Sequence, residues 1–187
     1  ESNEHGCIAA NSMVEFDGGL AWIGERGPVA ITGSGFEWIG KDIAKDFLGS
    51  NRKYARDSQG MMRHAWSCHD QERCLVYWGL ITTDATHQLD YQNKVATYAN
   101  HNDKAKSRFA CNEILVWSYR ANAFSIWKQP QGLEIYWMRR LTDKNGDMRV
   151  CFLAADGRIY AMDEEWQDTN RKPLSLVPAS SGSGTTF

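Results

Sequence analysis

Short runs of alternating apolar and polar residues, separated by turns rich in Gly and Asp, dominate this chain. The clearest case is residues 113–127 (EILVWSYRANAFSIW), where two apolar runs flank the polar turn 120–122. Strand side chains alternate between faces, so the first run (113–119) places large side chains on both faces and predicts a hairpin buried on both sides. Such a hairpin belongs between other sheets, as in a sandwich or in the blades of a propeller.

The same pattern recurs along the chain and predicts an all-β fold built of antiparallel meanders. Further strands are expected at 7–10, 13–16, 20–24, 28–32, 36–39, 62–68, 75–81, 133–141, 148–154 and 158–162. Turns between them fall at Gly-containing positions, where positive φ is tolerated, and at the polar segments 69–73 and 142–147. Pro28 indicates an edge or strand-start position, because Pro cannot donate to a ladder.

Three segments depart from the strand pattern. Residues 41–48 (KDIAKDFL) place apolar side chains on one face at helical spacing and predict one short helix capping a sheet edge. The alternation fails across residues 82–112, and loops longer than about 12–15 residues in compact domains are usually functional or ordered by a partner. The Ser/Gly-rich end predicts a flexible tail at 167–187, after a domain spanning 1–166.

Composition agrees with this fold class and limits the function. Eight Trp, seven Tyr and seven Phe favour pleated, half-buried surfaces over helix. The net charge of −2 argues against nucleic-acid binding through a broad basic surface, although it is compatible with a local basic patch. No run of apolar residues is long enough for a membrane span. The polar residues 1–6 lack an initiator Met and a signal-peptide pattern, which suggests a fragment or a processed chain.

Five cysteines at scattered spacings do not form the framework of a small disulfide-rich protein. Most lie in or beside apolar strands, where a reduced Cys behaves as a small hydrophobe. We therefore expect free thiols and synthesis in a reducing cytosol. The cysteines are Cys7, Cys68, Cys74, Cys111 and Cys151.

Meanders of four strands that recur every 40–50 residues or so are typical of propeller blades. The predicted strands would make roughly two to three blades of four strands each. A closed ring needs more blades than that, so the rest of the ring would lie outside this chain, or the sheets would form an open sandwich.

Several short motifs, in this order, carry a resemblance to a known family. They are HGCIAANSMV (5–14), DGGLAWIG (17–24), Gly27-Pro28-Val29 with Gly33, then Ile39, Ile43 and Phe47, Asp70 before LVYW (75–78), ILVWSY (114–119) with AFSIW (123–127), and DGRIY (156–160). Over residues 5–163 the chain resembles the β-propeller part of the tail nozzle or head-to-tail stabilisation proteins of short-tailed phages. It is shorter than a complete family member, and residues 82–112 have no counterpart there.

The resemblance implies a structural virion protein without enzymatic activity or cofactor. It implies a homo-oligomeric ring that lines a channel, contacts neighbouring tail proteins and DNA passing through, and resides in the phage tail after synthesis in the host cytoplasm. We expect the long insertion and the C-terminal segment to supply the contacts. The interface candidates are Asp84, His87, Tyr91, Lys94, Tyr98, His101 and Trp166.

A carbohydrate-binding or glycan-cleaving β module is the alternative. Exposed aromatic side chains would line its binding face, and the candidates are Trp38, Trp66, Trp78, Trp137 and Trp166. Cleavage needs two carboxylates at a defined separation across a sugar. Eight acids could supply them, although most stand at turns, where Asp caps its own backbone: Asp42, Asp46, Asp70, Glu72, Asp156, Asp163, Glu164 and Glu165.

Metal and phosphate sites are weaker alternatives. Cys68, His69 and Cys74, with His64 nearby, form the most metal-like cluster, but their spacing does not match a zinc motif and favours ordinary strand cysteines. Residues 143–147 (DKNGD) resemble part of a calcium loop without its final Glu, which favours a hairpin turn. Residues 33–35 (GSG) lack the Lys and helix of a phosphate loop and predict a turn.

Overall fold

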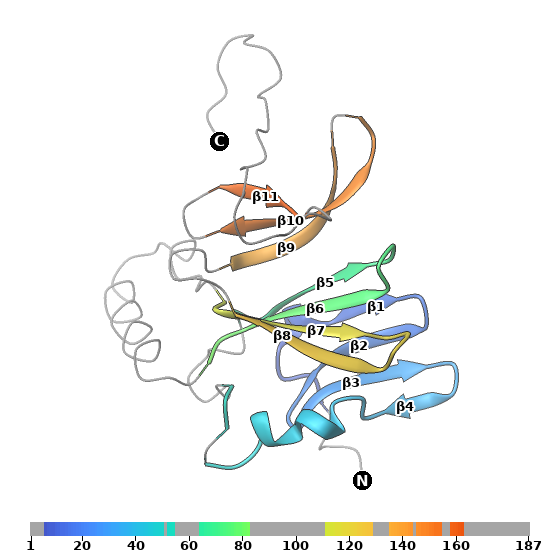
Figure 1. Cartoon of the computed structure of the whole chain (residues 1–187). Coiled ribbons are helices and arrows are strands. Elements are labelled where there is room, and N and C mark those ends of the chain that lie inside the picture. Colours follow the sequence, from blue (N-terminus) through green and yellow to red (C-terminus); the bar gives the residue numbers. More distant parts are fainter. Residues whose placement is uncertain are drawn as a thin grey trace.

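A computed structural model describes residues 6–50, 52–54, 64–82, 111–128, 135–143, 145–154 and 158–162. These residues form eleven strands in three antiparallel sheets, with two short 3-10 helices (Figure 1). The predicted all-β class is confirmed. No helix in the described ranges is long and apolar enough to cross a membrane. The predicted domain boundary at 166 and the tail 167–187 lie outside the described residues.

Sheet A is a four-stranded meander near the start of the chain. Its strands pair in sequence order: β1 (Val14–Phe16), β2 (Gly19–Gly24), β3 (Gly27–Thr32) and β4 (Gly35–Glu37). The predicted meander is confirmed. Pro28 is the second residue of β3 and lies beyond the part of β3 that pairs with β4, so its missing N–H leaves no gap in the sheet.

The strand predicted at residues 7–10 is wrong. Cys7 forms only an isolated bridge to Gly24, and the 3-10 helix η2 (Ala10–Ser12) follows. Buried Ser12 explains the turn, because its hydroxyl donates to the Ala9 carbonyl at 2.6 Å and accepts from the Ile23 backbone N–H at 2.9 Å. A local side-chain hydrogen bond therefore replaces a strand ladder.

Sheet C is a second meander, with strands β5 (Trp66–Asp70), β6 (Leu75–Leu80), β7 (Glu113–Ser118) and β8 (Ala123–Lys128). The first turn comes later than predicted, at residues 71–74 rather than 69–73. The reason is that His69 and Asp70 still pair with Val76 and Leu75 in the β5–β6 ladder. Residues 62 and 63 of the predicted strand lie outside the described residues.

Strand β7 is buried on both faces, as its sequence predicts, but its hairpin partner β8 is not. Ala123, Ser125, Ile126 and Lys128 are exposed, because β8 is the outer edge of sheet C. The expectation that both strands of the hairpin lie between sheets is therefore wrong for β8. An apolar pattern does not distinguish an edge strand from a central one, since that difference depends on which strands pair.

Sheet D contains β9 (Ile135–Thr142), β10 (Met148–Ala154) and β11 (Ile159–Ala161), with β10 in the centre. The β9–β10 hairpin closes through a turn in which Asp143 accepts hydrogen bonds from the Asn145 and Asp147 backbone N–H groups, at 2.8 and 3.0 Å. This confirms the hairpin-turn interpretation of residues 143–147. The turn predicted at residues 33–35 is likewise confirmed, between β3 and β4.

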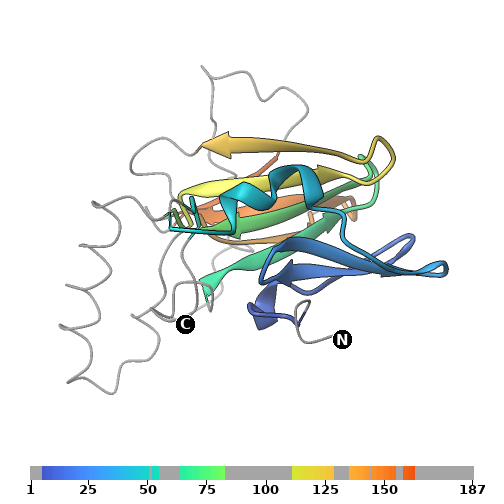
Figure 2. The ribbon, with the colours of Figure 1, turned by 90° about the horizontal axis from the view of Figure 1, so that it is seen from below.

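The helix predicted at residues 41–48 is a 3-10 helix, η3 (Lys41–Asp46), rather than an α-helix. Its last turn closes through the Phe47 N–H to the Ala44 carbonyl at 3.0 Å. Gly40 precedes it without a side-chain cap, and so few residues cannot stabilise an α-helix by themselves. Phe47 is nevertheless buried, and η3 lies at the end of β3 opposite the β3–β4 turn (Figure 2).

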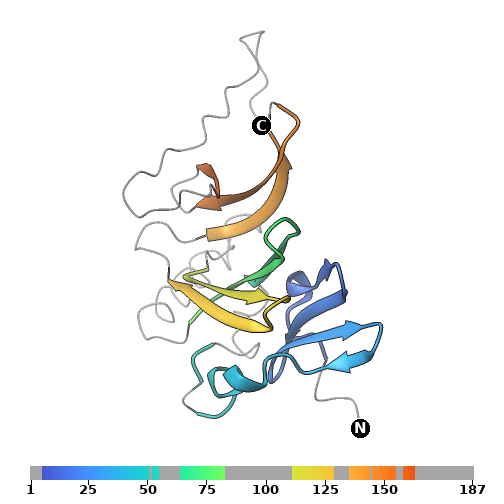
Figure 3. The ribbon, with the colours of Figure 1, turned by 45° about the vertical axis from the view of Figure 1, so that its right-hand side comes forward.

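The three sheets stack in chain order, with sheet C in the middle (Figure 3). On one side Trp78, Leu115 and Trp117 of sheet C pack with apolar residues of sheet A. On the other side Trp66, Tyr77 and Ile114 pack with apolar residues of sheet D. The first strands of the sheets are neighbours, since β5 contacts both β1 and β9. In the described part of the chain the stack is open, because one core joins sheet C to sheet A and another joins sheet C to sheet D, but neither joins sheet A to sheet D.

Candidate functional site

The structure describes the two ends of the long insertion. The interface candidates Asp84, His87, Tyr91, Lys94, Tyr98, His101 and Trp166 lie outside the described residues. The insertion joins β6 to β7, which are adjacent antiparallel strands. Its two ends are fastened together: the Asn112 side-chain amide donates to Thr82 Oγ1 at 2.7 Å, and the Thr82 backbone N–H donates to Asn112 Oδ1 at 3.0 Å.

The root of the insertion, formed by Thr82, Cys111 and Asn112, also contacts sheet D and the segment that follows η3. Cys111 and Ile135 exchange backbone hydrogen bonds of 2.7 and 3.0 Å, which link the root to the start of sheet D. Tyr54 forms a bridge to Thr82 from the segment that follows η3. The insertion thus leaves and rejoins the stack at one place, the end of sheet C where β6 ends and β7 begins.

A buried ion pair lies at the same place. Glu113, the first residue of β7, is buried, and its carboxylate contacts Lys53 Nζ at 2.7 Å and accepts from the Tyr54 hydroxyl at 3.2 Å. Burial, and then the neighbouring Glu113 carboxylate, raise the pKa of Tyr54 well above its usual value, so Tyr54 acts as a hydrogen-bond donor. Glu113 was not among the residues predicted to form a site. The available signal was a carboxylate opening an otherwise apolar strand.

Replacing Lys53 by Met is expected to lower the free energy of unfolding by about 2 kcal/mol, because it leaves the buried Glu113 charge without a cationic partner. Breaking a fully buried pair costs more, but the Lys53 side chain is 29% exposed, and solvent screens part of the interaction. Urea unfolding followed by circular dichroism measures the change.

The charge-preserving variant Lys53→Arg is the control and should lose less than half as much stability. A second variant, Glu113→Gln, removes the charge but keeps an acceptor for Tyr54. If Lys53→Met were as stable as the parent chain, the pair would contribute nothing to folding.

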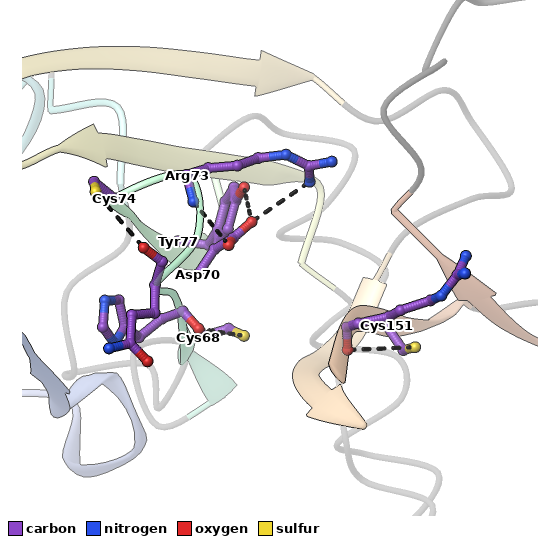
Figure 4. A network of polar contacts seen from close by, with 9 residues as sticks. Cys68, Asp70, Arg73, Cys74, Tyr77 and Cys151 are labelled. Carbon is purple, nitrogen blue, oxygen red and sulfur yellow. Dashed lines mark hydrogen bonds and ion pairs between the residues drawn. The ribbon is translucent and has the colours of Figure 1, made fainter. Parts of the chain in front are cut away.

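A second polar cluster lies at the opposite end of sheet C, in the β5–β6 turn (Figure 4). Buried Asp70 accepts hydrogen bonds from the Arg73 backbone N–H at 3.2 Å and from the Tyr77 hydroxyl at 3.4 Å, and it pairs with the Arg73 guanidinium at 3.4 Å. Burial, followed by Asp70, raises the pKa of Tyr77. Asp70 therefore stabilises its own turn, which includes Cys74 at positive φ.

A chain of hydrogen bonds links this end of sheet C to sheet A. His69 Nε2 lies 3.2 Å from the Tyr119 hydroxyl, which donates to Asp17 Oδ2 at 3.0 Å. Burial lowers the pKa of His69, so the ring favours its neutral form. Burial first, and then hydrogen bonds involving Cys74 and Asp17, raise the pKa of Tyr119, which makes it a poor nucleophile. These groups hold two sheets together.

The residues of the candidate metal cluster do not converge. Cys68 and His69 are successive residues of β5 and point to opposite faces: Cys68 joins the core shared with sheet D, while His69 contacts Tyr119. The Cys74 thiol is directed at the Gln71 carbonyl. Among the described residues no group of three His, Cys, Asp or Glu side chains could hold a metal ion.

The expectation of free thiols is confirmed for all five cysteines. Burial, and then the nearby Asp70 charge, raise the pKa of Cys68 to about 12, and burial also raises the pKa of the Cys111 thiol. Such thiols stay protonated at neutral pH and are poor metal ligands and nucleophiles.

The candidate tryptophans do not form one carbohydrate-binding face. Trp66 and Trp78 are buried in the two separate cores on opposite sides of sheet C. Trp38 and Trp137 are half-buried, in the segment after β4 and in β9 of sheet D. Trp166 lies outside the described residues. Trp66 and Trp78 therefore serve packing between sheets.

The end sheets present apolar residues on their outer faces, the faces turned away from sheet C. On sheet A, the outer face carries the cross-strand row Glu15–Leu20–Ile31–Phe36, in which Ile31 and Phe36 are each 46% exposed. On sheet D, the outer face carries the cross-strand rows Arg139–Cys151–Ala161 and Trp137–Leu153–Ile159. The sequence pattern does not predict these faces, because alternation along a strand does not assign which sheet lies between the others.

Together these observations define an all-β protein of three stacked meanders whose described polar clusters tie the fold together. Neither a model of a known protein family nor a curated protein matches the chain.

Proposed function

We propose that this chain is a structural component of a phage tail, of the nozzle or head-to-tail connector kind, and forms part of the wall of an oligomeric channel. One observation carries the proposal: sheet C is buried on both faces by neighbouring meanders, and the first strands of all three sheets lie next to one another. Consecutive propeller blades have this arrangement around their axis, with later strands farther out.

The chemistry of the described residues supports a structural role. Their strongest polar groups act inside the fold: Asp70 caps a turn, Glu113 pairs with Lys53, and Tyr119 links two sheets. Sheets held together by such contacts suit a rigid wall around a channel. On this proposal the protein resides in the virion, the insertion 82–112 and the C-terminal segment contact neighbouring tail proteins, and the channel passes DNA.

Excising the insertion tests the proposal. Since Thr82 and Asn112 already contact each other, a short Gly-containing turn can replace residues 83–110 without disturbing the β6–β7 ladder. The full chain is expected to form a ring-sized assembly, and the shortened chain is expected to fall apart into smaller species. Mass in solution by light scattering measures both, and circular dichroism checks that the shortened chain stays folded.

A full chain that remains monomeric, with or without its insertion, would contradict self-assembly through this element. Screening the same protein against glycans would then test the carbohydrate-binding alternative.

A further inference from the structure

The way the three sheets stack indicates which sheet faces stay uncovered at the two ends of the stack. Sheet A buries one face against sheet C, and sheet D buries one face against the opposite side of sheet C. Each end sheet therefore presents an outer face that the described stack leaves without a neighbouring sheet. The next step of the same repeat would place a sheet D against the outer face of a sheet A.

The side chains on the outer face of sheet A suit such burial. Leu20, Ile31 and Phe36 lie side by side on three paired strands, and the Phe36 ring packs beside Trp22 at a centroid distance of 6.3 Å. Leu20 is half-buried, whereas Ile31 and Phe36 stay exposed. A contiguous apolar row on paired strands marks an interaction surface more specifically than scattered apolar residues do.

The outer face of sheet D provides a matching surface. Leu153 and Ile159 are paired and half-buried on neighbouring strands, and Ala161 lies beside them. Sheet faces pack when apolar side chains of this size interdigitate.

The two outer faces carry opposite charges on their first strands. Glu15 is exposed on β1, the first strand of sheet A, and Arg139 is exposed on β9, the first strand of sheet D. Within the chain, first strands of stacked sheets are neighbours. Continuing that arrangement would bring β9 beside β1, so Arg139 would face Glu15, an oppositely charged residue. Complementary charges of this kind select partner and register.

We propose that the outer face of sheet A binds the outer face of sheet D of a second copy of this chain, with Arg139 opposite Glu15. Two different surfaces meet in this head-to-tail contact, so repeating it closes a ring or builds a filament. The proposal rests on the proposed function, because it names the interface through which the wall would assemble.

Ile31→Asp tests the apolar part of the interface. Introducing a charge at the centre of a buried patch is expected to weaken self-association on the order of 30-fold or more. Ile126→Asp is the matched control, because Ile126 is also an exposed strand Ile but lies on β8, outside both outer faces. Sedimentation velocity over a range of concentrations measures association, and circular dichroism confirms folding of both variants.

Charge reversal tests the register. Glu15→Arg and Arg139→Glu should each weaken association roughly tenfold, and the double variant should return it to near the parent value. Recovery in the double variant is a result that loss of folding cannot produce.

The outcomes separate the interface from the proposed function. Disruption by Ile31→Asp together with recovery in the charge-swapped double variant supports the interface. Suppose that the parent chain assembles and that its assembly requires the insertion. If Ile31→Asp then leaves self-association unchanged, or Ile126→Asp weakens it equally, the proposed interface is wrong while the proposed tail role stands. If the parent chain stays monomeric at every concentration, both are overturned, and the outer faces serve another partner or another part of the same protein.

Discussion

Trp78→Ala is expected to lower the free energy of unfolding by about 4 kcal/mol, in the range typical of removing a fully buried Trp. Trp78 is completely buried between sheets C and A, and its ring stacks on Trp117 at a centroid distance of 6.2 Å. Its indole N–H donates to the Ser12 carbonyl at 2.8 Å and so ties sheet C to the segment before β1. The substitution leaves a cavity and an unpaired buried carbonyl. Urea unfolding followed by circular dichroism measures the loss.

Two further variants separate the contribution of the Trp78 hydrogen bond from that of burying its ring. Trp78→Phe keeps most of the ring but removes the donor to Ser12, and should cost about 1–2 kcal/mol. Trp127→Ala removes a half-buried Trp from the edge strand β8 and should cost clearly less than Trp78→Ala. A loss below about 1.5 kcal/mol for Trp78→Ala would mean that the core between sheets A and C contributes little to stability.

Gly79→Ala is expected to destabilise the protein by about 3 kcal/mol, near the upper end for overpacking a core. Gly79 pairs with Trp66, and a Cβ at this position would overlap the Trp66 indole. That indole donates to the Ile135 carbonyl of sheet D at 3.2 Å. Moving the ring would therefore break a link between sheets C and D, in addition to straining the core. Thermal and urea unfolding measure the effect.

Gly33→Ala is the matched control, because a Cβ there meets no atom within 4 Å. Its stability should stay within about 0.5 kcal/mol of the parent value. In a double-mutant cycle, Trp66→Phe should cost less in the Gly79→Ala background than alone, since a smaller ring relieves the clash. Equal costs in both backgrounds would contradict the proposed overlap.

Adjacent residues of one strand thus connect sheet C to two different neighbours. Trp78 reaches toward sheet A, while Gly79 leaves room for the Trp66 ring that reaches sheet D. In the sequence LVYWGL both appear as parts of one apolar run. The alternation of the strand predicts opposite faces, but it does not predict what each face meets.

Local signals in the sequence determined most of the strands. Alternation of apolar residues and the placement of Gly, Asp and Asn at turns act over a few residues, so the order of residues alone predicts the meanders and the turn at residues 143–147. The burial of both faces of β7 was predictable for the same reason. The short helix at residues 41–46 was located correctly, although its 3-10 geometry was not predicted.

The tertiary structure alone decided how the sheets stack, that β8 is an exposed edge, and that Glu113 is buried beside Lys53. It also decided that Ile31 and Phe36 stay on an outer face while the equally apolar Ile23 is buried. The physical reason is that burial depends on contacts between segments far apart in the chain, such as β1 with β5 and Lys53 with Glu113. No local pattern encodes which distant segment arrives, and so the sequence determined the strands whereas tertiary packing determined the surfaces available for assembly.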